Sequence, residues 1–321
     1  APFSEEMGGL DGGPVETMVI MEELGRGLVV EPYLPTIVLC GGILNRHGSA
    51  AQKESHLPGI IAGENIWALA FNEPQGRFNL ADIVTSARAV GDSYVLNGAK
   101  AVVLGGPWAD KLIVSARISG NQRDRDGVGL FIVDKSADGV STQDYPTVDG
   151  GRASEVVLEN VTVSGDAIIG DAGSGLDILE EGVDYGIAAI CAEAIGHMKM
   201  LNDATVEYCR TRKQFGVPIG SFQVLQHRMV DMFMEYEQSV SMTYMVNMKL
   251  DEDAAARAKA AAGAKVQIGK SGRFVGQQAV QLHGGMGMTE ELNVGHFFKR
   301  LTMIDTQFGN VDHHLKRFAA A

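Results

Sequence analysis

The chain has 321 residues, with 27 lysines and arginines against 40 aspartates and glutamates, and so a formal net charge of -13. This acidic balance disfavours contact with phosphate backbones, so nucleic acid is not expected as a partner. No apolar run reaches the roughly 20 residues that a bilayer span needs, and the first residues lack the blocks of a signal peptide. We therefore expect a cytoplasmic protein without a membrane span, whose three cysteines are reduced and buried: Cys40, Cys191 and Cys209.

Residues 1–67 are predicted to form an N-terminal helical domain. Pro14 suits the first turn of a helix, apolar residues follow at near-helical spacing, and Gly25 is placed to end that helix. A new segment is expected to open at Tyr33-Leu34-Pro35, and Ser49 has the side chain needed to cap a further helix.

Residues 68–170 have the pattern of a β domain. Short runs rich in Val, Ile and Leu alternate with glycine and asparagine, over residues 92–96, 101–104, 112–114, 129–133 and 156–158. Asn97-Gly98 is a hairpin-turn signal between the first two runs. Several short strands joined by turns favour an antiparallel β-barrel or sandwich. No GxGxxG motif opens a helix after a strand, so a Rossmann fold is not indicated.

Residues 171–321 are predicted to form a C-terminal helical bundle, which makes the fold α+β and mostly α. On a first long helix, apolar positions recur in steps of three and four: Ile187, Cys191, Ala194, Met198, Leu201, Thr205 and Tyr208. A second helix has the same spacing at Leu225, Met229, Met232, Tyr236, Val240, Tyr244 and Met248. A third helix is expected from Asp253 to about Leu282, and a terminal one over residues 313–318.

Two segments make the order of these elements specific. RKQFGVPIG at residues 212–220, followed by Phe222-Gln223, resembles the loop between the first two bundle helices of acyl-CoA dehydrogenases. QLHGGMGMTEE at residues 281–291 is similar to that family's Gln-x-x-Gly-Gly-x-Gly-Tyr-Thr-x-Glu segment. Weaker similarities lie at residues 5–10, 22–26, 73–74 and 94–100. The resemblance covers essentially the whole chain, and it implies a helical domain, a β-barrel domain and a four-helix bundle.

The resemblance also implies FAD as cofactor and acyl-CoA as substrate. In the family, the two segments serve the adenosine and pyrophosphate of an FAD held mainly by a neighbouring subunit. The positions that match are Arg212, Gln214, Phe215, Gln223, Gln281, Leu282, Gly284 and Gly285. Their chemistry suits this role, since arginine offers a planar fork to phosphate and glycines allow close approach. The alternative is that Arg212 is a solvated helix-end cation and Gly284-Gly285 a helix C-cap.

The contacts that would hold the flavin ring depart from the family pattern. The family has Thr-Glu-Pro, then Gly-Ser-Asp, and a Trp-x-Thr on a later strand. This chain has Asn72-Glu73-Pro74, then residues 75–79 (QGRFN), and Val102-Val103-Leu104 at the corresponding places. The stacking aromatic ring and the hydroxyl donors are missing, so a weak flavin cradle is expected in this chain's own β domain.

The usual catalytic base is also missing. In the reaction that the resemblance implies, a carboxylate removes the α-proton of the thioester while the β-hydrogen leaves as hydride to the flavin. Phe308 stands at the usual base position, and Gly186-Ile187 at the alternative one. Glu193 lies on an otherwise apolar helix, where burial would raise its pKa toward a useful value. The competing interpretation is that Glu193 faces a partner subunit or pairs with a cation of the bundle.

These departures suggest one half of a heteromer. The contacts for a neighbour's FAD are kept, whereas those for an own flavin and base are lost, as in the small subunit of bacterial heteromeric acyl-CoA dehydrogenases of the pimeloyl-CoA or steroid side-chain type. We therefore predict an α2β2 heterotetramer with a related chain, acting in lipid or steroid catabolism. The chain also begins inside the family's N-terminal domain, so either the preceding residues are disordered or removed, or this version of the domain is short.

Two alternatives remain open at this point. One is a self-sufficient homo-oligomer that uses Glu193 as base, and the other is a structural homologue that binds no flavin. A metal site is not expected, because His313-His314 are adjacent on a helix and therefore point in different directions.

Overall fold

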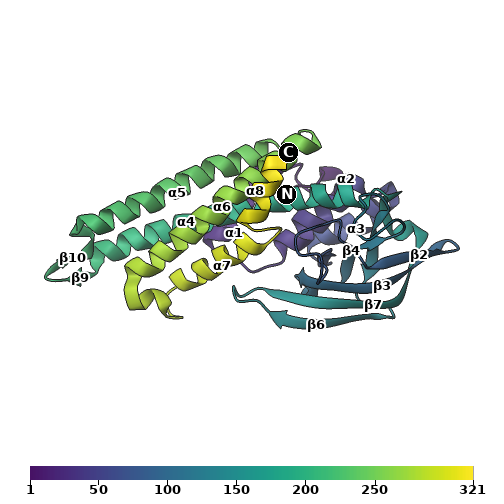
Figure 1. Ribbon diagram of the computed structural model, residues 1–321, viewed down its shortest axis with the longest axis horizontal. Helices are drawn as coiled ribbons and strands as arrows, with labels where there is room; N and C mark the ends of the chain where they lie inside the picture. The colour runs from purple at the N-terminus through teal and green to yellow at the C-terminus, as the bar shows by residue number, and fades with distance from the viewer. Residues whose placement is uncertain (321) are drawn as a thin grey trace. The chain divides into compact units, whose positions relative to one another are not determined.

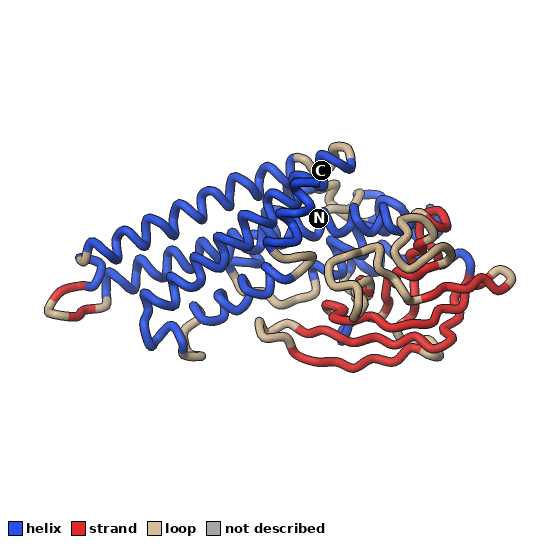
Figure 2. The backbone as a smooth tube through the Cα atoms, in the orientation of Figure 1, coloured by secondary structure: helices blue, strands red, loops and turns tan. Residues whose placement is uncertain are grey.

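The computed structural model describes residues 1–320, and the chain divides into two compact units (Figures 1 and 2). Unit 1 comprises Ala1–Gly13 and Glu31–Gly186, and unit 2 comprises Pro14–Val30 and Ile187–Ala321. The three cysteines are free and buried, as predicted. No helix within residues 1–320 is long and apolar enough to cross a membrane.

Unit 1 begins with short helices. They are η1 (Glu5–Met7), the π-helical η2 (Leu34–Gly41), α2 (Gly42–His47) and α3 (Ala50–Ala62). The predicted cap of α3 is confirmed: the Ser49 hydroxyl accepts a hydrogen bond from the Gln52 amide, and the Gln52 side chain accepts one from the Ser49 amide. This capping box fixes the start of α3 because it satisfies two amides that the helix itself leaves unpaired.

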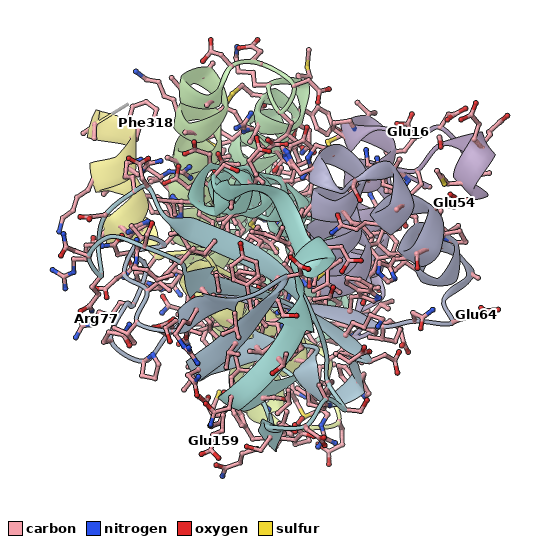
Figure 3. The ribbon with its side chains drawn as sticks, turned by 90° about the vertical axis from the view of Figure 1, so that its right-hand side faces the viewer. Glu16, Glu54, Glu64, Arg77, Glu159 and Phe318 are labelled. Carbon is pink, nitrogen blue, oxygen red and sulfur yellow. The ribbon has the colours of Figure 1, made fainter. Side chains whose placement is uncertain are left out.

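The centre of unit 1 is an eight-stranded sheet. Its strands are β1 (Trp67–Ala70), β2 (Ser86–Val90), β3 (Ser93–Leu104), β4 (Lys111–Arg117), β5 (Val128–Asp134), β6 (Val140–Pro146), β7 (Arg152–Ser164) and β8 (Ile168–Gly173). The order is β6-β7-β3-β2-β4-β5-β8, with β1 beside β4. The expected antiparallel pairing holds except that β1 and β2 each pair with β4 in parallel. Apolar residues such as Leu96, Leu112 and Phe131 fill its core. Figure 3 shows Glu54, Glu64 and Glu159 pointing outward, as an acidic surface requires.

The hairpin turn predicted at Asn97-Gly98 is wrong. β3 runs straight through these residues, and the chain reverses instead at Gly91-Asp92, between β2 and β3. Asn97-Gly98 forms an irregularity in the pairing of β3 with β7, where the Asn160 amide donates to Asn97 Oδ1. Gly98 has φ +154°, and a Cβ there would lie 2.5 Å from Thr85 Oγ1. Glycine is needed here because the strand forms a β-bulge and approaches Thr85 closely. The dipeptide Asn-Gly suits a bulge as well as a turn, so the sequence alone does not tell the two apart.

Unit 2 is a helical bundle. Its helices are α1 (Pro14–Arg26), α4 (Gly175–Thr211, which begins in unit 1), α5 (Gln223–Met248), α6 (Ala254–His283), α7 (Val294–Thr306) and α8 (Val311–Ala320). Between α4 and α5 lie β9 (Lys213–Gln214), β10 (Val217–Pro218) and η5 (Ile219–Ser221), and η6 (Gly284–Met288) follows α6. The predicted helices are confirmed, but α7 was not foreseen. α1 packs directly on α4 at Gly196, where a Cβ atom would lie 2.1 Å from the Glu22 carbonyl oxygen and only glycine leaves room.

The predicted packing face is right for α4 and holds on α5 as far as Val240. Leu225, Met229, Tyr236 and Val240 are half-buried, whereas Tyr244 and Met248 are exposed. The predicted positions of α4 from Ile187 to Thr205 are fully buried. Of the predicted positions on α5 only Met232 is buried, and the other buried residues of that helix are mostly small or polar: Ser239, Thr243, Val246 and Asn247. α5 packs along the alanine-rich α6, where small side chains allow close approach. Several large apolar side chains of α5 therefore remain exposed: Val224, Val230, Phe233, Met234, Tyr244 and Met248.

Candidate dinucleotide-binding end

The first candidate segment is a hairpin that joins α4 to α5. The Arg212 amide donates to the Tyr208 carbonyl at 2.8 Å, and the Arg212 carbonyl accepts from the Ile219 amide at 2.8 Å. Between these bonds β9 and β10 pair through Gln214 and Val217. The turn itself is formed by Phe215, with φ +53°, and Gly216, with φ +83°. The hairpin thus holds Arg212 at its base and the Phe215 ring at its tip.

The side chains of this hairpin face solvent. Arg212, Gln214 and Gln223 are exposed, and Phe215 is 91% exposed, with its ring 6.2 Å from that of Phe222. Lys213 adds another exposed cation beside Arg212. Two adjacent positive side chains, on a chain of net charge -13, have the charge that attracts an anion.

The second candidate segment is the C-terminal end of α6. Gly284 has φ +59° and its amide donates to the Gln281 carbonyl, so it ends the helix as the C-cap alternative requires. Gly285 is different, because its φ is not positive and a Cβ built there would meet no atom within 4 Å. Neither strain nor crowding within the chain explains this glycine. Gln281 is exposed, whereas the Leu282 side chain is buried, so only the backbone of Leu282 could reach a ligand.

The fold brings both segments to the same end of unit 2. Figure 1 shows β9 and β10 beyond one end of the bundle, the end at which α6 also turns toward α7. The contact that joins them is between the rings of Tyr208 in α4 and His283 in α6, whose centroids are 4.5 Å apart. The donors available here fit the dinucleotide part of FAD: an arginine fork, polar side chains and an open glycine backbone.

Glu193 does not have the environment expected of a base. Arg300, on α7, donates from Nε and Nη2 to the two carboxylate oxygens at 2.5 and 2.7 Å, and His197 Nε2 lies 3.1 Å from Oε1. Burial alone would raise the Glu193 pKa, but these partners hold it far below its ordinary value. The expected raised pKa is therefore wrong, and pairing with a bundle cation is what the structure contains. The sequence analysis did not identify Arg300 because it did not predict α7, the helix on which Arg300 lies.

Phe308 lies in a tightly held turn between α7 and α8. Its φ is +57°, in the left-handed region that a bulky residue rarely adopts. The buried Lys265 ammonium donates to the carbonyls of Asp305 and Gly309 at 3.0 and 2.7 Å, and His314 Nε2 lies 2.9 Å from the Phe308 carbonyl. Burial lowers the pKa of His314 to about 3, so this ring is neutral. Lys265 of α6 and His314 of α8 hold this turn in place, but the Phe308 side chain at the usual base position cannot take a proton.

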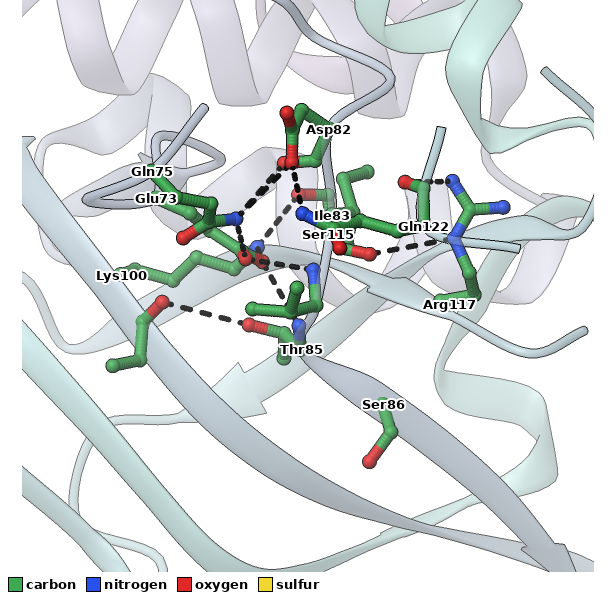
Figure 4. Close-up of polar contacts among 12 residues, drawn as sticks. Glu73, Gln75, Asp82, Ile83, Thr85, Ser86, Lys100, Ser115, Arg117 and Gln122 are labelled. Atoms are coloured by element: carbon green, nitrogen blue, oxygen red, sulfur yellow. Dashed lines mark hydrogen bonds and ion pairs between the residues drawn. The ribbon is translucent and has the colours of Figure 1, made fainter. Parts of the chain in front are cut away.

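In unit 1, Glu73 forms a buried ion pair (Figure 4). Lys100 Nζ donates to Glu73 at 2.6 Å and to the Ser115 hydroxyl at 3.0 Å, and the amides of Val84 and Thr85 donate to the same carboxylate. Burial lowers the pKa of Lys100 to about 8, while Lys100 and the amides lower that of Glu73. Both side chains are fully enclosed, so this pair anchors the loop before β2 rather than facing a ligand.

The segment that would meet the flavin ring offers no suitable group. Val102 has φ +52° at an irregularity of β3, and its amide donates to Glu155 at 3.2 Å. The Tyr145 hydroxyl donates to the same carboxylate at 2.6 Å. The Val102 amide is therefore already bonded to the Glu155 carboxylate. Val102 and Leu104 offer a flavin neither a hydroxyl nor an aromatic ring.

Comparison with known proteins agrees with this architecture. Three family models match in sequence: the acyl-CoA dehydrogenase N-terminal domain over residues 1–64, the middle domain over 68–161 and the C-terminal domain over 173–321. The molecule therefore has the acyl-CoA dehydrogenase fold, as predicted. The chain belongs to the acyl-CoA dehydrogenase family of oxidoreductases, whose members are FAD-dependent flavoproteins that dehydrogenate acyl-CoA, so the FAD prediction is confirmed at the level of the family.

Individual relatives are similar over nearly the whole chain. Mitochondrial isovaleryl-CoA dehydrogenase of Oryza sativa subsp. japonica is 33% identical over 95% of this chain and 75% of its own length. Among solved structures, butyryl-CoA dehydrogenase from Megasphaera elsdenii is 26% identical with a TM-score of 0.93, covering 100% of this chain and 85% of that one. The Tcur3481-Tcur3483 steroid ACAD is 28% identical with a TM-score of 0.89, covering 99% and 83%.

Proposed function

We propose that this chain is the subunit of a heteromeric acyl-CoA dehydrogenase that contributes the adenosine and pyrophosphate contacts to FAD held mainly by a related partner chain. Arg212 and Gln214 would bind the pyrophosphate, and the backbone at Gly284-Gly285 would approach the adenosine, with Phe215, Gln223, Gln281 and Leu282 around them. The partner supplies the catalytic base and the pocket of the flavin ring. We also retain the three-part division at residues 67 and 170 as a proposal.

The observation that carries this proposal is the open dinucleotide-binding end of unit 2. Among the described residues the Arg212 guanidinium makes no ion pair, and the space beside Gly285 holds no atom of the chain. A cation without a partner and a glycine without a structural need are both accounted for by a phosphate-containing ligand. In unit 1, by contrast, the Val102 amide on the strand that would meet the flavin ring is already paired with Glu155.

The exposed face of α5 supports assembly with another chain. This helix turns Ser239, Thr243 and Asn247 inward and leaves Phe233 and Met248 outside, with Met248 77% exposed. A surface helix normally has the reverse arrangement, so this face is suited to burial against a protein partner. The face leads from the Arg212 hairpin along α5, and a chain packed there would lie beside the proposed FAD contacts. We infer that the partner is a related chain of the same fold.

When bound, FAD would supply the hydride acceptor for the β-carbon of the acyl thioester. The part of this chain is to bind and orient: the fixed positive charge of Arg212 offsets the two negative charges of the pyrophosphate. Glu193 is not available as the base, because its carboxylate is enclosed and paired with Arg300. The likeness to a steroid ACAD favours a bulky acyl group, such as a steroid side-chain thioester.

The test is to purify the chain alone and after co-expression with a related acyl-CoA dehydrogenase chain, and to measure FAD absorbance per subunit and bleaching by butyryl-CoA and a steroid side-chain CoA thioester. We expect flavin and bleaching only in the co-expressed complex. Full flavin occupancy and turnover by the chain alone would refute the heteromer. A complex without flavin would favour a purely structural homologue.

Two variants separate binding from folding. Arg212→Ala should reduce FAD retention by the complex, whereas Lys316→Ala, which removes an exposed cation of α8, should not. Gly285→Ala should reduce FAD retention without lowering the melting temperature, because the added methyl group meets no atom of the chain. Unchanged FAD binding by both Arg212→Ala and Gly285→Ala would remove the dinucleotide site from this chain.

A further inference from the structure

We propose that Tyr208 and His283 are positioning residues, whose stacked rings hold the Arg212 hairpin and the Gly284-Gly285 backbone in the one arrangement that can grip a single dinucleotide. The inference rests on the proposed function, since it concerns the same end of unit 2. It assigns to two residues that touch no ligand the task of joining the halves of the site.

The two rings are in direct contact, and the His283 ring is buried. Their centroids are 4.5 Å apart, their planes are inclined by 32°, and His283 is buried, with Tyr208 half-buried over it. His283 Nδ1 lies 2.8 Å from the Ala279 carbonyl, which can only accept, so this nitrogen carries a proton. The imidazole thus bonds to its own helix and packs on the Tyr208 ring of α4.

Each ring is close along the chain to a group that would hold the ligand. The Tyr208 carbonyl accepts the Arg212 amide at 2.8 Å, so the tyrosine backbone forms the last turn from which the hairpin starts. His283 is the residue before Gly284 and is the last residue of α6. The stack thus connects the end of α4 with the end of α6 at the two points where the candidate segments leave their helices.

Such a connection is needed because helix ends and exposed hairpins are the parts of a bundle that move most readily. A ligand that must order two independent segments binds more weakly than one that meets them already in place. Burial lowers the pKa of His283, so the ring is neutral near pH 7 and stacks without the cost of a buried charge. The contact between the two rings thus fixes the Arg212 hairpin relative to the Gly284-Gly285 backbone.

The experiment uses the assembled complex with its FAD removed, and FAD rebinding is followed by fluorescence titration. Tyr208→Leu keeps apolar volume but removes the ring, and should weaken FAD binding about tenfold, the upper range for an aromatic pair. Tyr208→Phe keeps the ring and should bind within twofold of the parent. Val246→Ala, which shortens a fully buried side chain near the other end of α5, should lower the melting temperature and leave FAD binding unchanged. Tyr208→Met is the second ring-deleting variant if Tyr208→Leu does not assemble.

The outcomes separate this inference from the proposed function. If the parent complex binds no FAD, or Arg212→Ala binds it normally, the proposed function fails. If Arg212→Ala weakens binding but the ring-deleting variants bind normally, the positioning role is overturned. It is also overturned if Tyr208→Phe loses as much as Tyr208→Leu, or if Val246→Ala weakens binding to the same extent, because the effect would then follow the hydroxyl or overall stability.

Discussion

The ion pair between Glu193 and Arg300 gives the most exacting test of the interior of unit 2. The Glu193 side chain is 8% exposed and that of Arg300 is 17%, so both charges have lost most of their water. In Arg300→Met the carboxylate keeps only His197 as a partner, and losing one member of a buried pair costs about 3 to 5 kcal/mol. The double change Glu193→Gln with Arg300→Met removes both charges and should cost clearly less than this single change.

The pH dependence of the same pair has a definite sign. In the parent the folded-state pKa of Glu193 is lowered from 4.5, so the stabilisation is fully present above about pH 4.5 and is lost as the pH falls toward the folded value. In Arg300→Met burial dominates and raises this pKa, so the carboxyl becomes protonated on acidification and its penalty disappears. The difference in melting temperature between parent and Arg300→Met should therefore shrink from pH 7 to pH 4.

The assay is thermal unfolding of the parent, both single variants and the double variant at pH 4, 5.5 and 7, with FAD absent. Two results would refute the reasoning. One is a double variant that loses the sum of the two single losses, since the charges would then be independent. The other is a difference in melting temperature between parent and Arg300→Met that stays constant with pH, because the unpaired Glu193 carboxylate would then not be the cause of the lost stability.

Three further predictions follow from particular contacts. Glu193→Gln should leave turnover of the assembled complex largely unchanged, since its carboxylate is not free to take a proton; loss of acyl-CoA-dependent bleaching in a complex that still holds its flavin would restore it as a base. Lys265→Met removes the ammonium that donates to the buried carbonyls of Asp305 and Gly309, at about 1 to 3 kcal/mol for each carbonyl left unpaired. Hydrogen exchange in α8 should therefore speed up in this variant, but not in the exposed control Lys270→Met. Equal exchange in both variants would show that Lys265 does not hold the turn before α8. Gly98→Ala should lower the melting temperature by an amount equivalent to more than about 1 kcal/mol, because its Cβ would lie 2.5 Å from Thr85, and a neutral result would show that the bulge can relax.

Much of this protein was predictable because its signals are local. The capping box at Ser49, the apolar positions of α4 and the helix limits near Asp253 depend on residues within a turn or two of each other. The two family segments are likewise continuous in sequence, and the three family models match in the predicted order. The sequence by itself therefore determined the kinds and order of elements and the family, since local hydrogen bonding and periodicity decide them.

What only the tertiary structure decided is how distant residues meet. Asn97-Gly98 forms a bulge because Thr85 and β7 lie against it. α5 places polar residues inward because it packs on the alanines of α6. The pKa of Glu193 is lowered rather than raised because the fold places an arginine beside it that lies 107 residues away in the sequence. Whether a side chain is buried, and which charge state a buried group takes, both depend on the partners that the fold brings to it. The same reason separates Glu193, whose carboxylate pairs with Arg300, from Arg212, whose guanidinium makes no ion pair within residues 1–320.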